Sequence, residues 1–220
     1  MIEFDNVAKT YQNKWTALAN VSFKVEKGEF LFITGPTGAG KTTILKLIYA
    51  EELPTIGRVV VNNKIVNTIK KKEIPLYRRN IGIIFQDFKL LSDRTVYENL
   101  EFVLKAIDYK GDEIREKIIK TLTRLGLVHK KDCYPYQLSG GEQQKVAIAR
   151  ALVKDPEIIL ADEPTGNIDE EASREIINIF KEINLLGATV IMATHHQELP
   201  QILKKRRLHI VAGKIVYDGF

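Results

Sequence analysis

The sequence has almost no cysteine and no long apolar segment, and each absence excludes a class of protein. Cys133 is the single cysteine among 220 residues, so neither a disulfide framework nor a cysteine metal site is expected. No apolar stretch approaches the ~20 residues that a transmembrane helix requires, and residues 1–5 carry acids where a secretory leader would be apolar. We therefore expect a cytoplasmic protein that folds as one domain, with or without a small subdomain.

Positive charge is too dispersed to indicate a nucleic-acid-binding protein. The net charge is +5 and the isoelectric point is about 9.1, with basic clusters at residues 70–72, 78–79 and 204–207. No aromatic residues alternate with these clusters, and acids are spread almost as densely along the chain. We interpret the basic residues as a solvated face, with proximity to the anionic cytoplasmic leaflet of a membrane as the second interpretation and direct nucleic-acid binding as the third. We expect no nucleic acid as a partner.

A glycine-rich segment is the first feature that indicates a chemistry. The apolar run Phe30–Ile33 is typical of a buried strand, and residues 35–42 after it match the P-loop pattern G-x4-G-K-[ST]. Its glycines let backbone N–H groups converge on phosphate oxygens, and the helix predicted at residues 43–48 adds a favourable dipole. In this pattern Lys41 reaches the β- and γ-phosphates, and the Thr42 hydroxyl is a ligand of Mg²⁺. The predicted ATP-binding residues here are Gly35, Pro36, Thr37, Gly38, Ala39, Gly40, Lys41, Thr42 and Thr43.

Two adjacent acids follow a second pattern of a buried strand. Residues 157–161 are mostly apolar and lead into Asp162 and Glu163. Because successive side chains of an extended segment point in opposite directions, the two carboxylates can serve different tasks. In-line displacement at a γ-phosphate needs a Mg²⁺ ligand and a group that orients the attacking water. We assign the first task to Asp162 and the second to Glu163.

The alternation of strand and helix patterns predicts an α/β fold. Strand patterns occur at residues 2–8 and 20–26 (as edge strands), 30–33, 57–66 (a strand pair around Asn62-Asn63), 81–85, 157–161, 189–193 and 208–216 (a hairpin). Helical periodicity covers residues 95–126 and about 170–185, and the shared apolar face of the first is Ile114, Ile118, Leu122 and Leu125. We therefore expect a mostly parallel core sheet flanked by helices, with a helical subdomain at about residues 87–155.

A second glycine-rich segment, Leu138–Gln143, precedes another helical run. Together with the P-loop, it makes the chain resemble the ATP-binding-cassette (ABC) ATPases, with the motifs in the family's order. The resemblance extends over residues 1–220 and implies a single nucleotide-binding domain. It also implies a P-loop NTPase fold of the ABC-ATPase type, with an antiparallel β subdomain and a helical signature subdomain, and ATP and Mg²⁺ as cofactors.

Single residues acquire roles from this resemblance. Tyr11 matches the aromatic that stacks on adenine, and Gln86 matches the Q-loop glutamine, which contacts Mg²⁺ or the water and senses a membrane partner. Asp169 lies in the segment that matches the D-loop, which communicates between two sites. His195 matches the switch histidine that donates to the γ-phosphate, and its spacing from the preceding strand favours it over His196. The implied catalytic residues are Glu163, His195 and Gln86, and the implied Mg²⁺ ligands are Thr42, Gln86 and Asp162.

The segment at residues 138–143, which matches the family's signature motif, implies a dimer. In the family two subunits pack head to tail, and each ATP lies between the P-loop of one chain and the signature of the other. The signature residues that would act on the partner's ATP are Ser139, Gly140, Gly141 and Glu142, at a helix N-terminus that forms a second cradle for phosphate. We therefore expect a homodimer in the ATP-bound state and poor hydrolysis by a monomer.

Within the family the chain is most similar to the ATPases of bacterial cell division. The matching stretches are residues 81–91, 93–99, 138–150 and 160–169. This similarity implies an integral membrane partner that docks near the Q-loop, and ATP-driven motion that reaches cell-wall hydrolases across the inner membrane, with the chain on its cytoplasmic face. The ATPases of lipoprotein release and macrolide export share the sequence Glu-Pro-Thr-Gly-Asn at residues 163–167 and are the alternative. Soluble ABC ATPases that act on DNA or ribosomes are a third class, which usually carries two cassettes or a long coiled-coil insertion.

Overall fold

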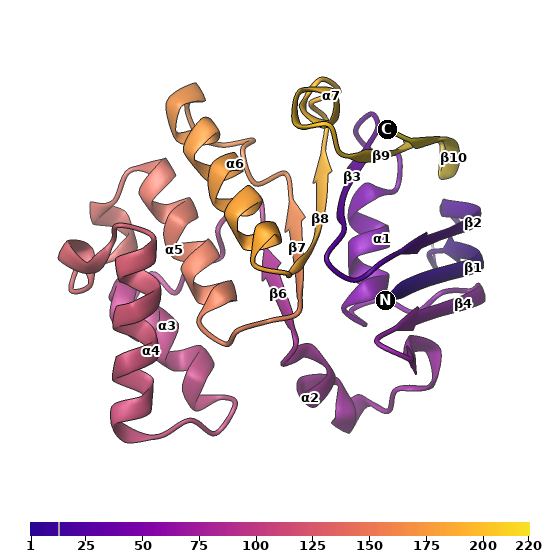
Figure 1. Ribbon diagram of the computed structural model, residues 1–220. Coiled ribbons are helices and arrows are strands. Elements are labelled where there is room, and N and C mark those ends of the chain that lie inside the picture. The colour runs from indigo at the N-terminus through magenta and orange to yellow at the C-terminus, as the bar shows by residue number, and fades with distance from the viewer. Residues whose placement is uncertain (13) are drawn as a thin grey trace. The chain divides into compact units, whose positions relative to one another are not determined.

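The computed structural model describes residues 1–12 and 14–220. The chain forms two compact units, and most of their helices and strands are labelled in Figure 1. The first unit contains residues 1–78 and 187–220, and the second contains residues 79–186. The second unit is therefore an insertion in the sequence of the first, and the helical subdomain predicted at residues 87–155 lies within its bounds.

An antiparallel sheet forms one part of the first unit. Its strands are β1 (Ile2–Thr10), β2 (Thr16–Val25), β4 (Ile56–Val61) and β5 (Lys64–Ile65), in the order β2-β1-β4-β5. The predicted edge position of residues 2–8 is wrong, because Ile2 pairs with Val25 on one side and Val61 on the other. An alternating pattern of burial shows that one face of a strand is covered. It does not show whether the strand has a neighbour on one edge or on both edges.

The turn between β4 and β5 reverses the chain through two asparagines. Asn62 and Asn63 have positive φ angles of 48° and 62°. Two consecutive left-handed residues form the type I′ turn whose twist matches a β-hairpin, and Asn adopts that conformation more readily than most residues. The strand pair predicted at residues 57–66 is therefore confirmed.

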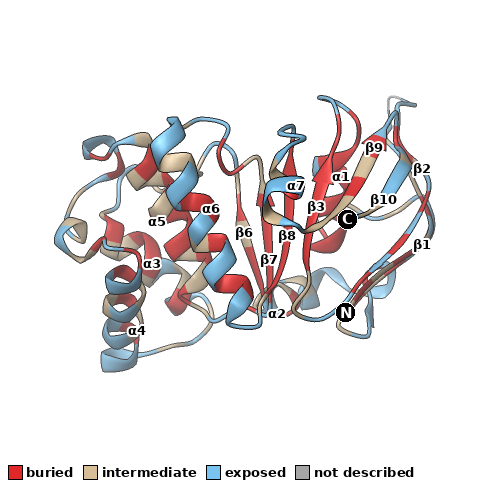
Figure 2. Cartoon of the chain, turned by 45° about the horizontal axis from the view of Figure 1, so that its top comes forward, coloured by how far each residue is buried: buried red, intermediate tan, exposed pale blue. Residues whose placement is uncertain are grey.

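Parallel strands form the other sheet of the first unit. They are β3 (Phe30–Thr34), β8 (Thr189–Thr194) and β9 (Arg206–Val211), with β10 (Lys214–Gly219) antiparallel to β9. β3 pairs with β8 on one side and β9 on the other. Every residue of β3 and β8 is buried, as the red strands in Figure 2 show. The continuous apolar runs of the sequence therefore correspond to the most buried strands of this sheet.

Short helices complete the first unit: α1 (Lys41–Ile48), α2 (Ile74–Arg78) and α7 (Leu199–Leu203), with 3-10 turns at Val66–Thr68 and Lys71–Glu73. α2 is too short to show a helical period in the sequence. Its Tyr77 hydroxyl donates to the carbonyl of Ile48, and burial raises the pKa of that hydroxyl. Arg78 Nε donates to the carbonyl of Tyr49 at 2.8 Å. Hydrogen bonds to the end of α1 therefore hold α2 in place.

Two parallel strands and longer helices build the second unit. The strands are β6 (Ile81–Ile84) and β7 (Ile158–Asp162), and the helices are α3 (Val96–Lys105), α4 (Gly111–Arg124), α5 (Gly140–Leu152) and α6 (Glu170–Leu185), with 3-10 turns at Val128–Lys130 and Pro135–Gln137. The helical pattern at residues 95–126 corresponds to two helices, α3 and α4. The predicted apolar face of α4, Ile114, Ile118 and Leu122, is buried. In the part of the chain that the structure describes, no helix is long and apolar enough to cross a membrane.

α3 begins with a side-chain cap and contains a buried asparagine. Thr95 Oγ1 accepts a hydrogen bond from the Glu98 N–H at 3.2 Å, and Glu98 Oε2 accepts one from the Thr95 N–H at 2.8 Å. Asn99 is fully buried, and its amide oxygen accepts a hydrogen bond from the Leu91 N–H at 2.8 Å. Its amide nitrogen donates to the carbonyls of Leu91, Arg94 and Thr95. One side chain therefore holds the loop that precedes α3.

We predict that Asn99→Ala lowers the free energy of unfolding by about 2–3 kcal/mol, because it leaves buried backbone groups without partners. Urea denaturation followed by circular dichroism measures this change. Asn178→Ala is the control: Asn178 is exposed on α6, so its loss should change the free energy of unfolding by less than about 0.5 kcal/mol. Equal effects of the two substitutions would contradict the role of Asn99.

Candidate functional site

The P-loop, residues 35–42, connects β3 to the start of α1. Gly40 is the N-cap of α1, and no described side chain caps this helix. By contrast, the side chains of Thr95, Ser139 and Asp169 cap α3, α5 and α6, respectively. The start of α1 therefore lacks the side-chain cap that these three helices have, and the helix dipole favours an anion there.

Lys41 lies inside this loop. It is buried, and its Nζ donates to the carbonyl oxygens of Gly35 at 2.8 Å and Pro36 at 3.2 Å. Burying an ammonium group costs free energy, and neutral carbonyls offset that cost less well than an anion does. A buried lysine at an uncapped helix start therefore fits a phosphate ligand.

Neighbouring strands lie very close to the P-loop backbone. A Cβ atom on Gly35 would lie 2.2 Å from the carbonyl oxygen of Ile210 on β9. A Cβ atom on Gly40, whose φ is 108°, would lie 2.5 Å from the carbonyl oxygen of Ala17 on β2. Glycine is required at these two positions because no side chain fits between the loop and the strands.

Tyr11 lies beside the P-loop helix and a cavity. Its Oη is 3.4 Å from Oγ1 of Thr43, and its ring stacks on Trp15 with centroids 5.5 Å apart and 13° between the planes. A cavity of about 580 Å³ is lined by Lys9, Thr10, Tyr11, Gln12, Trp15 and Glu52. Aromatic rings beside polar side chains suit a planar heteroaromatic base. Trp15 was not predicted, because a lone tryptophan outside any motif carries no signal.

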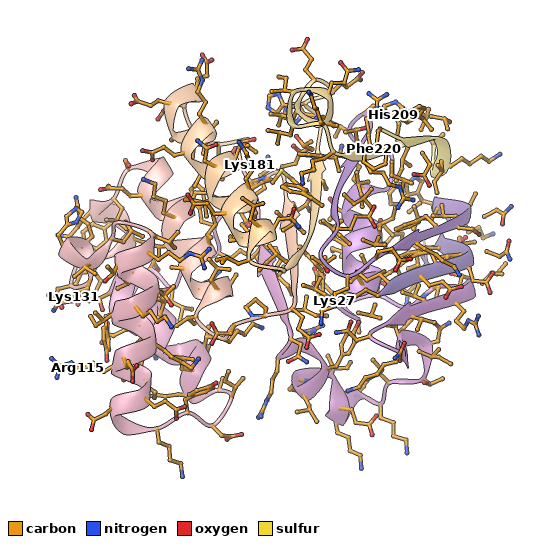
Figure 3. All side chains as sticks on the ribbon, in the orientation of Figure 1. Lys27, Arg115, Lys131, Lys181, His209 and Phe220 are labelled. Carbon is orange, nitrogen blue, oxygen red and sulfur yellow. The ribbon has the colours of Figure 1, made fainter. Side chains whose placement is uncertain are left out.

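The P-loop and the predicted switch histidine follow strands that end at the same edge of the sheet. Thr34 and Thr194 are register partners at the ends of β3 and β8, and His195 follows directly. His195 is exposed, and its ring centroid lies 4.3 Å from that of His196. On β9, Nδ1 of His209, labelled in Figure 3, lies 2.9 Å from Oγ1 of Thr34. The structure thus brings His195 to the edge that carries the P-loop, as expected for the carboxyl ends of parallel strands.

In the second unit, the two predicted acids stand at the end of β7. Asp162 is the last residue of the strand, and Glu163 follows it with a φ of 47°. A left-handed conformation is uncommon for a glutamate and is often found at functional sites. The Gly166 N–H donates to the Glu163 carbonyl at 3.0 Å and closes this turn. The chain therefore changes direction between the two carboxylates, which suits groups with separate tasks.

Gln86 lies beside the turn that contains Glu163. The strands that precede these residues, β6 and β7, are paired in parallel. A Cβ atom on Gly166 would lie 3.3 Å from Nε2 of Gln86. Asn167 Nδ2 donates to the Gln86 carbonyl at 3.0 Å. The structure therefore brings the predicted Q-loop glutamine next to the loop that carries the predicted catalytic acid.

The signature segment forms the N-terminal end of α5. Ser139 is the N-cap: its Oγ accepts a hydrogen bond from the Glu142 N–H at 3.2 Å, and its N–H donates to Glu142 Oε2 at 2.9 Å. The Ser139 N–H, and to a lesser degree Lys130, hold the pKa of the Glu142 carboxyl below its ordinary value. A Cβ atom on Gly141 would lie 2.7 Å from Cβ of Ala172, so α5 and α6 approach closely here. The predicted D-loop residue Asp169 caps α6 by accepting a hydrogen bond from the Ala172 N–H at 2.8 Å.

Two polar side chains of α5 that hold these loops were not predicted. Gln144 is buried and donates to the Pro164 carbonyl at 2.8 Å. Arg150 donates to the carbonyls of Phe88 and Lys89, which have positive φ angles of 57° and 49°, and burial lowers the pKa of its guanidinium. Their only sequence signal is a polar residue within an apolar helical run, and this signal does not identify the loop that is contacted.

The oxygen donors predicted for Mg²⁺ have the chemistry that this ion prefers. Thr42 offers a hydroxyl, Gln86 an amide oxygen and Asp162 a carboxylate. Thr42 belongs to the first unit, and Gln86 and Asp162 belong to the second. Outside the undescribed residue 13, no group of three or more His, Cys, Asp or Glu side chains could hold a metal ion. A site with one carboxylate fits Mg²⁺ that is held mainly by nucleotide phosphates and water.

The chain is similar to known ABC proteins over nearly its whole length. The model of the ABC transporter family matches residues 18–166. The cell division ATP-binding protein FtsE of Bacillus subtilis (strain 168) is 48% identical over 218 residues, which are 99% of this chain and 96% of that protein. FtsE of Escherichia coli (strain K12) is 45% identical over 215 residues, which are 98% of this chain and 97% of that protein. The solved dimer of MJ0796, a bacterial ABC transporter cassette, is 36% identical with a TM-score of 0.89, covering 99% of this chain and 97% of that chain.

Gly213, in the turn between β9 and β10, supports the P-loop. Its N–H donates to the carbonyl of Ala39 at 3.1 Å, and its carbonyl accepts a hydrogen bond from the Ala19 N–H at 2.9 Å. Its φ is 74°, and a Cβ atom there would lie 2.7 Å from the carbonyl oxygen of Ala17. A side chain at this position would therefore displace the P-loop or β2.

We predict that Gly213→Ala weakens nucleotide affinity by at least about tenfold, because the P-loop N–H groups lose their alignment. Titration with a fluorescent ATP analogue measures this affinity. Gly126→Ala is the matched control: its φ is 70°, and among the described residues no heavy atom lies within 4 Å of the Cβ it would gain. That variant should lose about 1 kcal/mol of stability from backbone strain and keep its affinity. If both variants bind the analogue equally well, Gly213 does not support the P-loop.

Proposed function

The chain belongs to the ABC transporter family, and we propose that it is the ATP-hydrolysing subunit of a membrane complex that acts in cell division. As an ABC-type ATPase it binds ATP and converts ATP and water to ADP and phosphate. The observation that carries the assignment of the site is the placement of Lys41, buried inside the P-loop at the uncapped start of α1.

The first unit binds the nucleotide. Lys41 exchanges the carbonyl oxygens of Gly35 and Pro36 for oxygens of the β- and γ-phosphates, and this exchange replaces neutral acceptors with charged ones. Tyr11, whose ring is stacked on Trp15, contacts the adenine. The remaining P-loop residues contribute backbone N–H groups at the start of α1.

Several loops supply the groups that hydrolysis requires. Thr42, Gln86 and Asp162 hold Mg²⁺, which when bound offsets the charge of the phosphate oxygens. Glu163, whose backbone is left-handed, orients and polarises the attacking water. His195 of the first unit donates a hydrogen bond to the γ-phosphate and stabilises the charge that develops there.

Hydrolysis takes place between two copies of the chain. Structures of the similar cassette MJ0796 are dimers, one of them bound to ADP and phosphate at 35% identity and a TM-score of 0.89. In the ATP-bound state the signature residues of one copy face the γ-phosphate that is held by the P-loop of the other. These residues are Ser139, Gly140, Gly141 and Glu142.

The complex also contains an integral membrane partner that resembles FtsX. The relatives that carry the name FtsE support this partner, which docks near Gln86. The chain then lies on the cytoplasmic face of the inner membrane, and its cycle of ATP binding and hydrolysis drives the partner to activate cell-wall hydrolases.

We predict that Lys41→Ala weakens ATP binding by at least about tenfold, because the P-loop loses its charge-assisted donor to the phosphates. The same fluorescent-analogue titration measures the affinity. Lys27→Ala is the control, since Lys27 is exposed and lies at the turn before β3 (Figure 3). Unchanged affinity in Lys41→Ala would contradict the phosphate site.

We further predict that Glu163→Gln keeps ATP affinity and accumulates ATP-bound dimers, because the amide cannot polarise the attacking water. Size-exclusion chromatography with light scattering, in the presence of ATP, measures the dimer. Glu113→Gln, on the exposed start of α4, is the control and should remain monomeric under the same conditions. Adding Ser139→Ala to Glu163→Gln should reduce the dimer without reducing ATP affinity, and an equal loss of both would argue against action in trans.

A further inference from the structure

The signature end of α5 carries a negative charge. Glu142 lies in the first turn of α5, and its Oε2 accepts a hydrogen bond from the Ser139 N–H at 2.9 Å. Because this bond lowers the pKa of the carboxyl, Glu142 is ionised at neutral pH. An anion here stabilises the helix through its dipole, but it repels any phosphate that approaches the same N–H groups.

Lys130 lies against this charge. Its Nζ is 3.2 Å from Glu142 Oε1, the oxygen that the Ser139 N–H does not use. Lys130 belongs to the 3-10 turn Val128–Lys130, which precedes α5 in the sequence. The two side chains are 30% and 27% exposed, so the pair is less screened by water than a fully exposed pair would be.

The neighbouring lysine has the same charge and a different environment. Lys131, labelled in Figure 3, pairs with Asp132 at 2.8 Å, and its side chain is 42% exposed. Of the two adjacent lysines, Lys130 is therefore the one that contacts the signature segment, and Lys131 is a natural control for it.

From this geometry we propose that Lys130 is a positioning residue for the signature, where it neutralises the Glu142 carboxylate. The start of α5 then stays electropositive towards the γ-phosphate held by a second copy of the chain. The inference rests on the proposed function, in which Ser139 and the N–H groups after it contact ATP in trans. Lys130 itself touches no nucleotide and acts through Glu142.

Dimerisation in ATP tests this role without depending on turnover. In the Glu163→Gln background, sedimentation velocity measures the dimer affinity at saturating ATP. Lys130→Met should weaken this affinity about tenfold, because an uncompensated carboxylate then faces the incoming phosphates. Lys131→Met should change it by less than about twofold, and Lys130→Arg, which keeps the charge, should preserve it.

The Glu142→Gln background separates charge from structure. Glutamine accepts the same hydrogen bond from the Ser139 N–H, so the helix cap is retained while the charge is removed. In that background Lys130→Met should change dimer affinity by less than about twofold. If Lys130 only ties the 3-10 turn to α5, Glu142→Gln alone will weaken the dimer as much as Lys130→Met does, because the amide nitrogen cannot accept a hydrogen bond from Lys130 Nζ. That outcome would overturn the proposal.

Failure of this inference is distinguishable from failure of the proposed function. Monomeric Glu163→Gln in ATP would overturn both. Dimers that respond equally to Lys130→Met and Lys131→Met would overturn only the role of Lys130. Thermal denaturation without nucleotide shows whether each variant is folded. If Lys130→Met does not fold, Lys130→Gln replaces it in both Glu142 backgrounds, and the dimer affinities are compared in the same way.

Discussion

The close approach of β2 and β9 to the P-loop backbone is the constraint on which the nucleotide site of the first unit depends. The carbonyls of Ala17 and Ile210 occupy the space that side chains on Gly40 and Gly35 would need. The loop is therefore held by packing, and the start of α1 has no side-chain cap. Because β3 and β8 are parallel and in register, the same edge also carries His195. Phosphate binding thus follows from how the strands pack, beyond the presence of glycines in the motif.

In the second unit, too, the candidate site residues follow the carboxyl ends of parallel strands, here β6 and β7. Its loops are held by side-chain hydrogen bonds, whereas the P-loop is held by close packing against strands. Gln86 and Glu163 follow these parallel strands. Hydrogen-bonding side chains then fix the loops: Asn167 donates to the Gln86 carbonyl, and buried Gln144 donates to that of Pro164. Directional bonds in a buried environment restrict a loop to one arrangement more strongly than apolar contacts do. Such restriction suits the role proposed for Glu163, which is to orient a water molecule.

In the proposed function, each of the two phosphate-binding segments depends on a different lysine. Lys41 lies within the P-loop and contacts the phosphates directly in the proposed function. At the signature, Ser139 and Glu142 cap α5, and the cap adds a negative charge where the proposed function brings a phosphate. Lys130 offsets that charge from outside the motif. The stability of the helix start and its affinity for an anion are thereby made compatible.

The order of the elements, and the strand ends and helix starts at which the motif residues lie, were predictable from the sequence, because both depend on local patterns. The strand predicted at residues 30–33 and the helix predicted at about 170–185 are present in the structure, as the apolar patterns of the sequence indicated. Three tertiary features were not predictable: the stacking of Trp15 on Tyr11, the contact of Arg150 with residues 88–89, and the central position of β1. A local pattern records which face of a segment is buried, but it does not contain the identity of the segment that covers it. Only the folded chain decides that, since Arg150 is distant in the sequence from residues 88–89, and β1 from its partner β4.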